Sequence, residues 1–380
     1  MIVRLSPAHL SGKITVPPSK SHAQRLLIAA WLAGDKSRVR LTESSADIAA
    51  CVRCLDALEG ENPTLDCGDS GAVLRFLTPV AAMCGGARMT GSRQLAARPM
   101  GDLLSALSAN GCRISGDTLP FSVSGTLHGG VYTLPGNVSS QFVSGLLFAL
   151  PRLSEDSEIR LTSPLQSAGY AEMTRSVLAK FGVTSRKTAD GFFVPGRQQY
   201  TLPAGELIPE GDWSAAAVWL TVNALGGDIA LSGLTRGSLQ GDERMEKLCE
   251  SLPDCADLAD IPDLLPLLSV LAAFKKTDTR FLHVGRLRYK ESDRLNGCAD
   301  MICALGGRAE ASGDELLVHA QPLSGGRADA QGDHRMAMAA AAAACACRQD
   351  VVLSGAESVD KSYPAFWADY QQLGGQMHVL

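Results

Sequence analysis

No apolar run in this chain of 380 residues is long enough to cross a membrane. The longest, Met336 to Cys347, has twelve residues between Arg335 and Arg348, whereas a spanning helix needs about 20. This run therefore predicts a buried helix, and we expect no membrane association. Met1 to Ser6 contains no apolar stretch behind a basic one, so we expect no secretory signal and a cytoplasmic location.

An excess of positive charge is also lacking. Lys and Arg total 35 against 40 Asp and Glu, a net charge of −5, which argues against a nucleic-acid partner but allows a local basic pocket. The 11 cysteines are odd in number and scattered, as is typical of reduced thiols. Cys51 and Cys54 form one pair within a helical pattern, with no second pair or His nearby, so we expect no metal.

What the chain does contain is an internal repeat. Six segments share a polar start followed by a helix that is apolar on nearly every side, a pattern typical of the centre of a domain. These segments begin near Ser21, Ser70, Ser140, Asp212, Pro262 and Asp333.

Each apolar helix is followed by an alternating segment and then by an amphipathic helix. Alternation with period two favours strands with one buried face. The predicted strands are 39–42, 88–92, 159–163, 229–233, 281–285 and 351–355. The predicted second helices are 46–58, 101–109, 170–181, 242–252, 291–305 and 363–373.

Six units of this kind fit two globular sets of three better than a solenoid, because the spacing between their starts is uneven. Stiff or turn-prone residues at Pro17-Pro18 and at 209–211 indicate the points where the chain crosses between domains. We therefore predict an α/β (α+β) fold with a discontinuous domain of residues 1–18 plus 210–380 and a second domain of residues 19–209.

Polar residues open the apolar helices, where free N–H groups and a partial positive charge favour anions. Several such ends facing one cleft would bind a small polyanion. Taken singly, the same residues have plainer interpretations: Ser139 and Asp212 as N-caps, Arg98 as a solvated loop charge, and 290–294 as an exposed helix start. The cations nevertheless recur at matching points of the repeat, in a chain that is acidic overall.

Eight short motifs occur in a specific order along essentially the whole chain. They are Pro18-Ser-Lys-Ser21 with Arg25, Gly68-Asp-Ser-Gly71 with Arg75, Arg98-Pro99, Ser139-Ser-Gln141, Ile261-Pro-Asp263, Lys290-Glu-Ser-Asp-Arg294, Asp333-His-Arg-Met336 and Lys361-Ser362. In this order they resemble the 5-enolpyruvylshikimate-3-phosphate (EPSP) synthase family, the 3-phosphoshikimate 1-carboxyvinyltransferases.

The resemblance implies a fold and a reaction. The family has two domains, each of three βαβαββ units with buried parallel helices, and an active site in the cleft between them. It transfers the enolpyruvyl group of phosphoenolpyruvate to the 5-hydroxyl of shikimate-3-phosphate and releases phosphate, in the shikimate pathway to chorismate and the aromatic amino acids. The resemblance implies no cofactor and no metal, small-molecule substrates as the only partners, and a monomer that is a glyphosate target.

Site residues follow from the resemblance, position by position. The implied catalytic residues are Lys20, Asp263 and Glu291: Asp263 takes the proton of the attacking hydroxyl, while either Lys20 or Glu291 protonates the methylene carbon. Shikimate-3-phosphate is implied to bind Ser21, Arg25, Ser139, Ser140, Gln141, Ser167, Tyr170, Asp263 and Lys290. Phosphoenolpyruvate is implied to bind Lys20, Gly71, Arg98, Gln141, Arg294, Arg335 and Lys361, with Arg75 and Asp333 in support.

Departures from the family pattern leave the inhibitor sensitivity open. Asp69, Ala72 and Phe76 replace a common Asn, Thr and Pro, and Arg286 stands where Asn is frequent. Three alternatives also stay open: a UDP-N-acetylglucosamine enolpyruvyl transferase, an RNA 3′-phosphate cyclase, and a non-catalytic descendant. The loop 91–97 lacks the Cys that the first alternative typically carries, and Lys20, Asp263 and Glu291 are all present, against the last.

Overall fold

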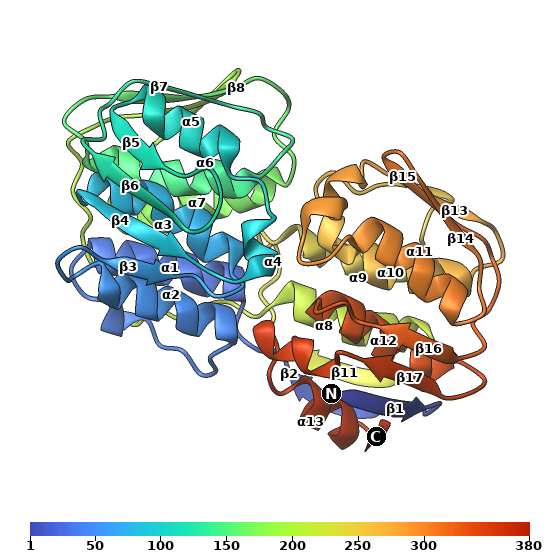
Figure 1. The fold of residues 1–380 in the computed structure, drawn as a ribbon. Helices are drawn as coiled ribbons and strands as arrows, with labels where there is room; N and C mark the ends of the chain where they lie inside the picture. The colour runs from blue at the N-terminus through green and yellow to red at the C-terminus, as the bar shows by residue number, and fades with distance from the viewer. The chain divides into compact units, whose positions relative to one another are not determined.

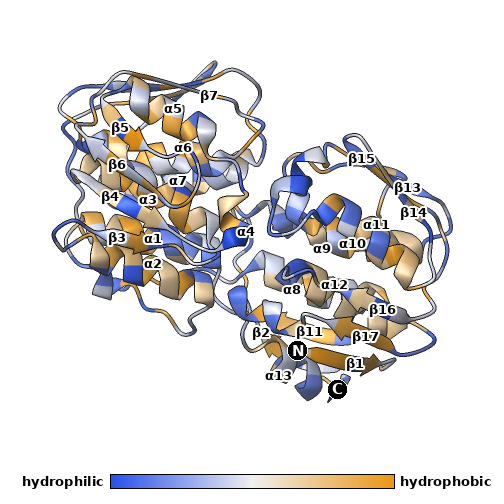
Figure 2. Cartoon of the chain, viewed as in Figure 1, coloured by the Kyte–Doolittle hydropathy of each residue, from blue (hydrophilic) through white to orange (hydrophobic).

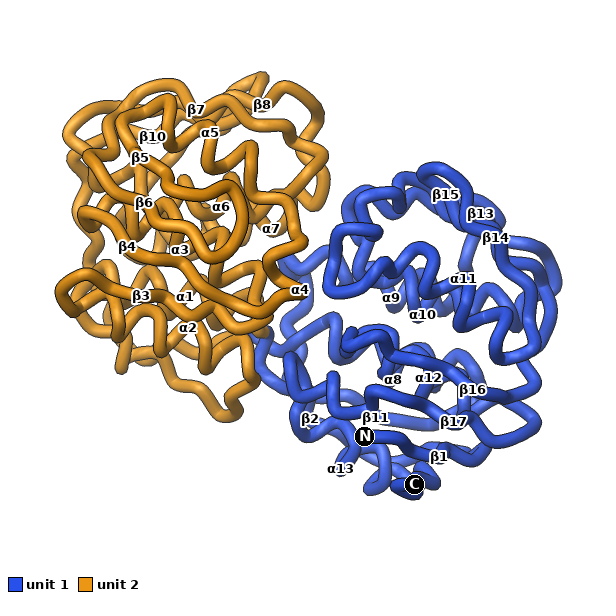
Figure 3. The backbone as a smooth tube through the Cα atoms, in the orientation of Figure 1, with its two compact units in different colours: residues 1–19, 210–380 blue, residues 20–209 orange.

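A computed structural model describes residues 1–380, which fold into two units (Figure 3). Unit 1 comprises Met1–Ser19 and Glu210–Leu380, and unit 2 comprises Lys20–Pro209. The boundaries drawn from the sequence differ from these by the single residue Ser19. Ser19 belongs to unit 1 because its backbone N–H donates to Glu210 O at 2.7 Å and its hydroxyl donates to Gln240 Oε1 at 3.0 Å.

Unit 2 has two four-stranded sheets, ordered β3-β4-β6-β5 and β7-β8-β10-β9. Its helices are α1 (Lys20–Leu32), η1 (Lys36–Arg38), α2 (Ala46–Ala57), α3 (Gly71–Met83), α4 (Arg93–Ala96), α5 (Gly101–Ala109), α6 (Ser140–Ala149), η2 (Leu150–Arg152) and α7 (Ala168–Lys180). Its strands are β3 (Thr64–Asp66), β4 (Gly86–Thr90), β5 (Cys112–Ser115), β6 (Phe121–Gly125), β7 (Val131–Leu134), β8 (Ser157–Leu161), β9 (Arg186–Thr188) and β10 (Gly191–Val194).

Unit 1 has two four-stranded sheets, β12-β13-β15-β14 and β16-β17-β1-β18, and a two-stranded sheet of β2 and β11. Its helices are α8 (Trp213–Ala224), η3 (Gly241–Arg244), α9 (Met245–Glu250), η4 (Pro262–Leu264), α10 (Leu265–Ala273), η5 (Gly285–Tyr289), α11 (Arg294–Ala304), α12 (His334–Ala346), η6 (Ala356–Lys361) and α13 (Phe366–Gln372). Its strands are β1 (Ile2–Ser6), β2 (Ser11–Thr15), β11 (Asp228–Ser232), β12 (Cys255–Asp257), β13 (Thr279–Leu282), β14 (Ala309–Ser312), β15 (Glu315–Val318), β16 (Gly326–Asp329), β17 (Val351–Ser354) and β18 (Gln376–Val379).

All four large sheets repeat one connection (Figure 1). The first two strands of each sheet are parallel and are joined through a buried helix, as the parallel pair β3 and β4 is joined through α3. The other two strands add antiparallel. The sheet at the chain ends is completed by the N-terminus, where Val3 of β1 pairs with Leu353 on one side and Val379 on the other. This strand-helix-strand-helix-strand-strand order confirms the predicted repeat.

The remaining two repeats are incomplete, and here one predicted strand is wrong. β2 and β11 form a parallel pair in unit 1, but residues 39–42 of unit 2 form no strand. Only Val39 makes a bridge, to Leu207, because the preceding residues turn into η1, which the Asp35 carboxylate caps by accepting from the Ser37 N–H. The alternation of residues 39–42 thus reflects a single bridge beside a turn.

The apolar helices are the cores of both units, as predicted. Nearly every residue of α3, α6, α10 and α12 is buried, and Figure 2 shows the hydrophobic colouring of α10 and of the strands β1 and β17. α6 packs on α3 at Gly145, where an added Cβ would overlap the Arg75 carbonyl and lie 3.2 Å from Pro79 Cγ. A residue without a side chain is therefore required at this crossing. None of the helices is both long and apolar enough to span a bilayer.

Candidate active site

In unit 1, Arg294 is the centre of a buried ionic cluster. It opens α11 and is 1% exposed. Its Nε lies 2.6 Å from Asp333 Oδ2, its Nη1 2.7 Å from Asp263 Oδ1 and its Nη2 2.6 Å from Glu291 Oε2. Burial by itself would lower the pKa of Arg294, but the three carboxylates outweigh it and raise that pKa, so the guanidinium stays charged. One arginine thus connects three elements that carry predicted site residues.

Asp263, on η4, contacts three cations of this cluster. Besides Arg294, its Oδ1 lies 3.2 Å from Lys290 Nζ, and its Oδ2 lies 3.3 Å from Arg335 Nη2. Burial alone would raise the pKa of Asp263, but the positive charges of Arg335, Lys290 and Arg294 prevail and hold this pKa well below its usual range. The carboxylate is therefore ionised and able to accept a proton once its cations are occupied by other anions.

Lys290 and Lys361 supply two further cations. Burial lowers the pKa of Lys290 to about 8, opposed by Asp263 and assisted by the like charges of Arg294 and Arg286. Lys361 ends η6, and its Nζ lies 4.0 Å from Glu291 Oε1. Glu291 therefore stands between a lysine and an arginine.

The fourth cation, Arg335, is in the first turn of α12. Its backbone N–H donates to Asp333 Oδ1 at 2.9 Å, so the N-cap residue of α12 also fixes the start of the arginine. Its Nη2 donates to Ser214 Oγ at 3.2 Å, and its Nη1 lies 3.8 Å from Asp242 Oδ2. Four cations thus face four carboxylates in unit 1, an arrangement that can exchange internal partners for bound anions.

In unit 2, Lys20 opens α1 and pairs with an acid at the start of α2. Its Nζ lies 2.9 Å from Asp47 Oδ2, and both side chains are largely buried. The Asp47 backbone carbonyl accepts from Gln24 Nε2 at 3.1 Å, which ties the two helix starts together. The lysine ammonium is therefore held in a defined position beside a carboxylate.

Arg25 joins three helices of unit 2 around Tyr170. It is 2% exposed. Its Nε donates to Thr174 Oγ1 at 2.8 Å, its Nη1 to Ser21 O at 2.8 Å, and its Nη2 to Tyr170 O at 3.1 Å and Ser144 Oγ at 3.3 Å. The guanidinium also lies 5.8 Å from the centre of the Tyr170 ring. Burial lowers the pKa of Arg25 to about 10, which still leaves it charged at neutral pH.

The guanidinium of Arg98 lies against Gly71, at the start of α3. A Cβ at Gly71 would lie 2.7 Å from Arg98 Cζ and 3.0 Å from its Nη2. Beside it, Arg75 Nη1 donates to Gln141 Oε1 at 2.9 Å and its Nη2 to Pro99 O at 3.0 Å. Gly71, Arg98, Arg75 and Gln141 therefore form one group, in which the lack of a side chain at Gly71 makes room for the arginine.

Three serines lie at helix starts in the same unit. Ser139 caps α6 through its hydroxyl, which accepts from the Gln141 N–H at 3.3 Å, and Ser140 follows as a buried residue. Ser167 precedes α7 with φ of 55°, a left-handed conformation that is uncommon for a residue with a side chain. Such strain is common at functional sites.

The structure also brings in residues that the sequence did not indicate. Asp47 pairs with Lys20, Thr174 and Ser144 hold Arg25, and Asp242 with Ser214 lies beside Arg335. Asp47 and Asp242 carried a weak signal, because each is an acid in the first turn of a predicted helix, where a negative charge is favoured. The others lie in apolar or charged runs that have no feature of their own.

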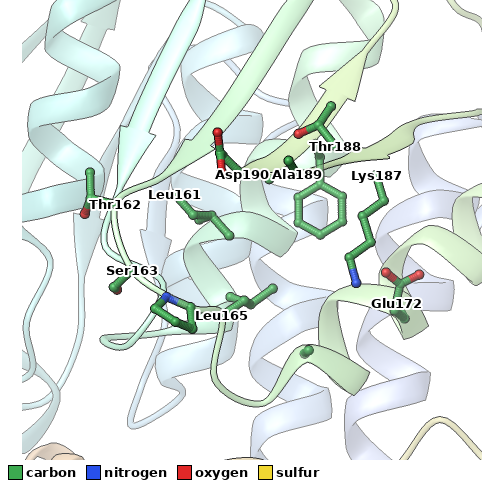
Figure 4. A pocket seen from close by; sticks show the side chains of 13 residues that line it. Leu161, Thr162, Ser163, Leu165, Glu172, Lys187, Thr188, Ala189 and Asp190 are labelled. Carbon is green, nitrogen blue, oxygen red and sulfur yellow. The ribbon is translucent and has the colours of Figure 1, made fainter.

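A separate cavity of unit 2, about 470 Å³, lies beside β8, β10 and α7 (Figure 4). The view shows the ammonium of Lys187 near the carboxylate of Glu172, and Leu161 and Leu165 line the apolar side. The Glu172 carboxylate is already paired with Arg175 at 2.6 Å. None of the residues predicted for the site lines this cavity.

Comparison with known proteins identifies the family. The family described as EPSP synthase (3-phosphoshikimate 1-carboxyvinyltransferase) matches residues 5–65, 59–252 and 249–370. The chain belongs to the EPSP synthase family. It is 36% identical over 421 aligned residues to the 3-phosphoshikimate 1-carboxyvinyltransferase of Clostridium acetobutylicum, with 99% of this chain and 98% of the relative covered. The same named enzyme of Clostridioides difficile is 33% identical, with coverages of 99% and 98%.

Solved structures agree on the fold of this EPSP synthase family member. The EPSP synthase from Acinetobacter baumannii matches with a TM-score of 0.72 at 21% identity, covering 100% of both chains. The enolpyruvyl transferase NikO from Streptomyces tendae matches with a TM-score of 0.79 at 15% identity, covering 99% of this chain and 98% of that one. The predicted α/β (α+β) fold of two domains built from repeats is therefore confirmed.

Proposed function

We propose that this chain is a 3-phosphoshikimate 1-carboxyvinyltransferase, which transfers the enolpyruvyl group of phosphoenolpyruvate to the 5-hydroxyl of shikimate-3-phosphate and releases phosphate. The observation that carries the proposal is the cluster of Lys290, Arg294, Arg335 and Lys361 around Asp263 and Glu291. Both substrates are phosphorylated carboxylates. Cations held beside acids suit a reaction that binds such anions and moves protons among them.

In the first step we assign the proton of the attacking hydroxyl to Asp263. The pKa of Asp263 is low, which makes it a weak base. Substrate phosphates and carboxylates that engage Lys290 and Arg335 would remove the charge that holds the pKa down. Binding of the substrates therefore makes Asp263 a stronger base at the moment when it is needed.

The second proton goes to the methylene carbon of phosphoenolpyruvate, and the resulting tetrahedral adduct then loses phosphate and one proton from that carbon. Glu291 and Lys20 are the candidates for this transfer. Glu291 lies between Arg294 and Lys361, and Lys20 lies against Asp47. Each therefore has a neighbour that can balance its change of charge.

The binding groups divide into direct contacts and supports. We propose that shikimate-3-phosphate is held by Ser21, Ser139, Ser140, Gln141, Ser167, Tyr170 and Lys290, and that phosphoenolpyruvate is held by Lys20, Gly71, Arg98, Gln141, Arg335 and Lys361. Arg25 and Arg294 are each almost fully buried and make four hydrogen bonds to protein atoms. Their part in the two sites is therefore mainly to hold the other residues in place.

The product distinguishes this proposal from its nearest alternative. Incubation with phosphoenolpyruvate and shikimate-3-phosphate should yield 5-enolpyruvylshikimate-3-phosphate by mass spectrometry. The same incubation with UDP-N-acetylglucosamine as acceptor should yield no enolpyruvyl product. The reverse preference would identify the sister transferase, and no product with either acceptor would identify a non-catalytic descendant.

The proposal includes a cytoplasmic monomer that binds neither nucleic acid nor membrane.

Replacing Gly71 with Ala is expected to weaken phosphoenolpyruvate binding. The added methyl group would lie 2.7 Å from Arg98 Cζ, so the flexible arginine must move out of its position while the fold is kept. Displacement of a binding group by about 1 Å can cost up to roughly 100-fold, and we expect KM for phosphoenolpyruvate to rise by at least roughly tenfold. Inhibition by glyphosate should weaken in parallel.

Gly101→Ala is the matched control, because an added Cβ at this helix start meets no atom within 4 Å. Its kinetic constants should stay close to those of the parent. Equal KM and inhibition constants in the Gly71→Ala variant and the parent would count against a role of Arg98 in this site.

The pH dependence of kcat/KM for shikimate-3-phosphate should report Lys290. The pKa of Lys290 is lowered to about 8 in the free enzyme, so its charge is complete below that pH and is lost as the pH rises through it. A neutral lysine binds phosphate less well, and kcat/KM should fall above about pH 8. In Lys290→Arg this alkaline limb should move to higher pH, because arginine stays protonated.

A profile whose alkaline limb is the same in the parent and in Lys290→Arg would show that another group titrates there. Lys276→Arg, an exposed change in the loop after α10, serves as the control and should keep the parent profile.

A further inference from the structure

Asp242 is a buried carboxylate of unit 1 that the proposed mechanism does not use. It lies on η3 and is 1% exposed. Its Oδ2 accepts a short hydrogen bond from the Ser214 hydroxyl, on the first turn of α8. Its Oδ1 is buried without a hydrogen-bond partner. Such an atom costs free energy in a folded protein, so its retention calls for an explanation.

A second side chain beside Asp242 is that of Arg335, one of the cations assigned to phosphoenolpyruvate. Arg335 Nη1 lies 3.8 Å from Asp242 Oδ2, and Arg335 Nη2 bonds Ser214 Oγ, which links the two. The guanidinium also pairs with Asp263, whose Oδ2 lies 3.3 Å from Nη2. The guanidinium is therefore held between a proposed catalytic acid and an acid that lies deeper in the protein.

We propose that Asp242 is a proton-linked positioning residue for Arg335: it holds the guanidinium while the anion site is empty and takes up a proton when an anion engages Arg335. The inference rests on the proposed function, because it takes Arg335 as a phosphoenolpyruvate ligand. The proton comes from solvent and returns to it when the anion leaves. The carboxylate would otherwise repel the incoming anion from within the protein.

The charges around Asp242 favour this exchange. Burial raises the pKa of Asp242 to about 6. Arg335 on α12 and the hydrogen bond from Ser214 lower this pKa, while the negative charges of Asp263 on η4 and Asp212 at the start of α8 raise it. Glu243 and Arg244, on its own helix, are more exposed. An anion that draws the positive charge of Arg335 away removes the main opposing influence, so the pKa of Asp242 rises further and the carboxyl group is protonated near neutral pH.

The test compares KM for phosphoenolpyruvate in the parent and in Asp242→Asn from about pH 6 to pH 8. Asn has the same shape, still accepts from Ser214, and is neutral at every pH, so it imitates the protonated acid. The ratio of parent KM to variant KM cancels the titration of phosphoenolpyruvate itself. We expect this ratio to rise with pH by about tenfold per unit at most, and by at least about threefold over the range.

Two outcomes of this comparison decide the proposal. A ratio that is constant with pH would overturn it, because a merely structural role of Asp242 shifts KM equally at every pH. A rising ratio supports it. Glu243→Gln removes an acid from the same helix whose carboxylate accepts from the Gly237 N–H at 2.8 Å. For this control, the ratio of the parent KM to the Glu243→Gln KM for phosphoenolpyruvate should not change with pH.

Ser214→Ala keeps the test decisive if Asp242→Asn does not fold. Loss of the hydroxyl removes a hydrogen bond that lowers the pKa of Asp242, so the pH at which the KM for phosphoenolpyruvate begins to rise should move upward. An unchanged pH would contradict the linkage.

Calorimetry with phosphoenolpyruvate alone separates this inference from the proposed function. Titration in two buffers of different protonation enthalpy measures proton uptake without turnover. Greater uptake by the parent than by Asp242→Asn supports the linkage even in a chain that releases no phosphate. Equal uptake, or no binding at all, overturns it.

Discussion

Replacing Asp263 with Asn is expected to lower kcat for phosphate release by about 10³-fold, within the range found for a general base. The amide cannot take up the hydroxyl proton, while its size and its position near Lys290, Arg294 and Arg335 are kept. Removal of one negative charge from among three cations should not weaken anion binding. KM values should therefore stay similar or fall, and the loss should appear in kcat.

Asp257→Asn is the matched control for this variant. Asp257 is a more exposed acid of unit 1 that pairs with His283 at 2.9 Å. Its kcat should stay close to that of the parent, because its carboxylate pairs with His283 and not with the cations around Asp263. A kcat for Asp263→Asn within about fivefold of the parent would exclude Asp263 as the base, and the proton would then have to leave through another group.

The largest expected loss of stability comes from Arg294→Met. Methionine fills much of the space but leaves the carboxylates of Asp263, Glu291 and Asp333 without their shared cation in a buried site. Removal of one partner of a buried ion pair typically costs about 3–5 kcal/mol. The free energy of unfolding should fall by that amount, and the loss should be smaller in acid, where the carboxylates are protonated.

Urea denaturation followed by tryptophan fluorescence measures this loss. Three of the four tryptophans, Trp213, Trp219 and Trp367, lie in unit 1, so the signal follows mainly that unit. Arg280→Met is the control, since Arg280 pairs with Glu315 on the surface at 3.3 Å and such pairs contribute at most about 1 kcal/mol. Equal stability of both variants would show that the Arg294 cluster contributes nothing to the fold.

Much of the fold can be predicted from the sequence, because its two periodicities are local. Helices α5 and α2 begin at the residues where the pattern placed them, and the apolar helices are the cores. Residues 39–42 could not be predicted correctly, because the partner of Val39 is Leu207, far along the chain. Alternation over four residues does not reveal whether a second strand is present to pair with it.

Only part of the candidate site can be predicted from the sequence. Asp333 and Ser139 can be predicted as N-caps, because each is a cap-forming residue just before an apolar helix. The partners of Arg335 do not, because Ser214 and Asp242 come from two other elements and meet it only through the tertiary fold. Burial cannot be predicted from the motif either. The motif indicates Arg294 as a site residue, but only the structure shows that its side chain is buried and paired with Asp263, Glu291 and Asp333.

Phosphate release from phosphoenolpyruvate, measured with one variant from each unit, tests the central claim most directly. The claim is that cations and acids of both units serve one reaction on two acidic substrates. The account predicts release by the parent only when shikimate-3-phosphate is also present, and strong losses in both Lys20→Ala of unit 2 and Asp263→Asn of unit 1. Release that needs no shikimate-3-phosphate, or that survives either substitution unchanged, would contradict it.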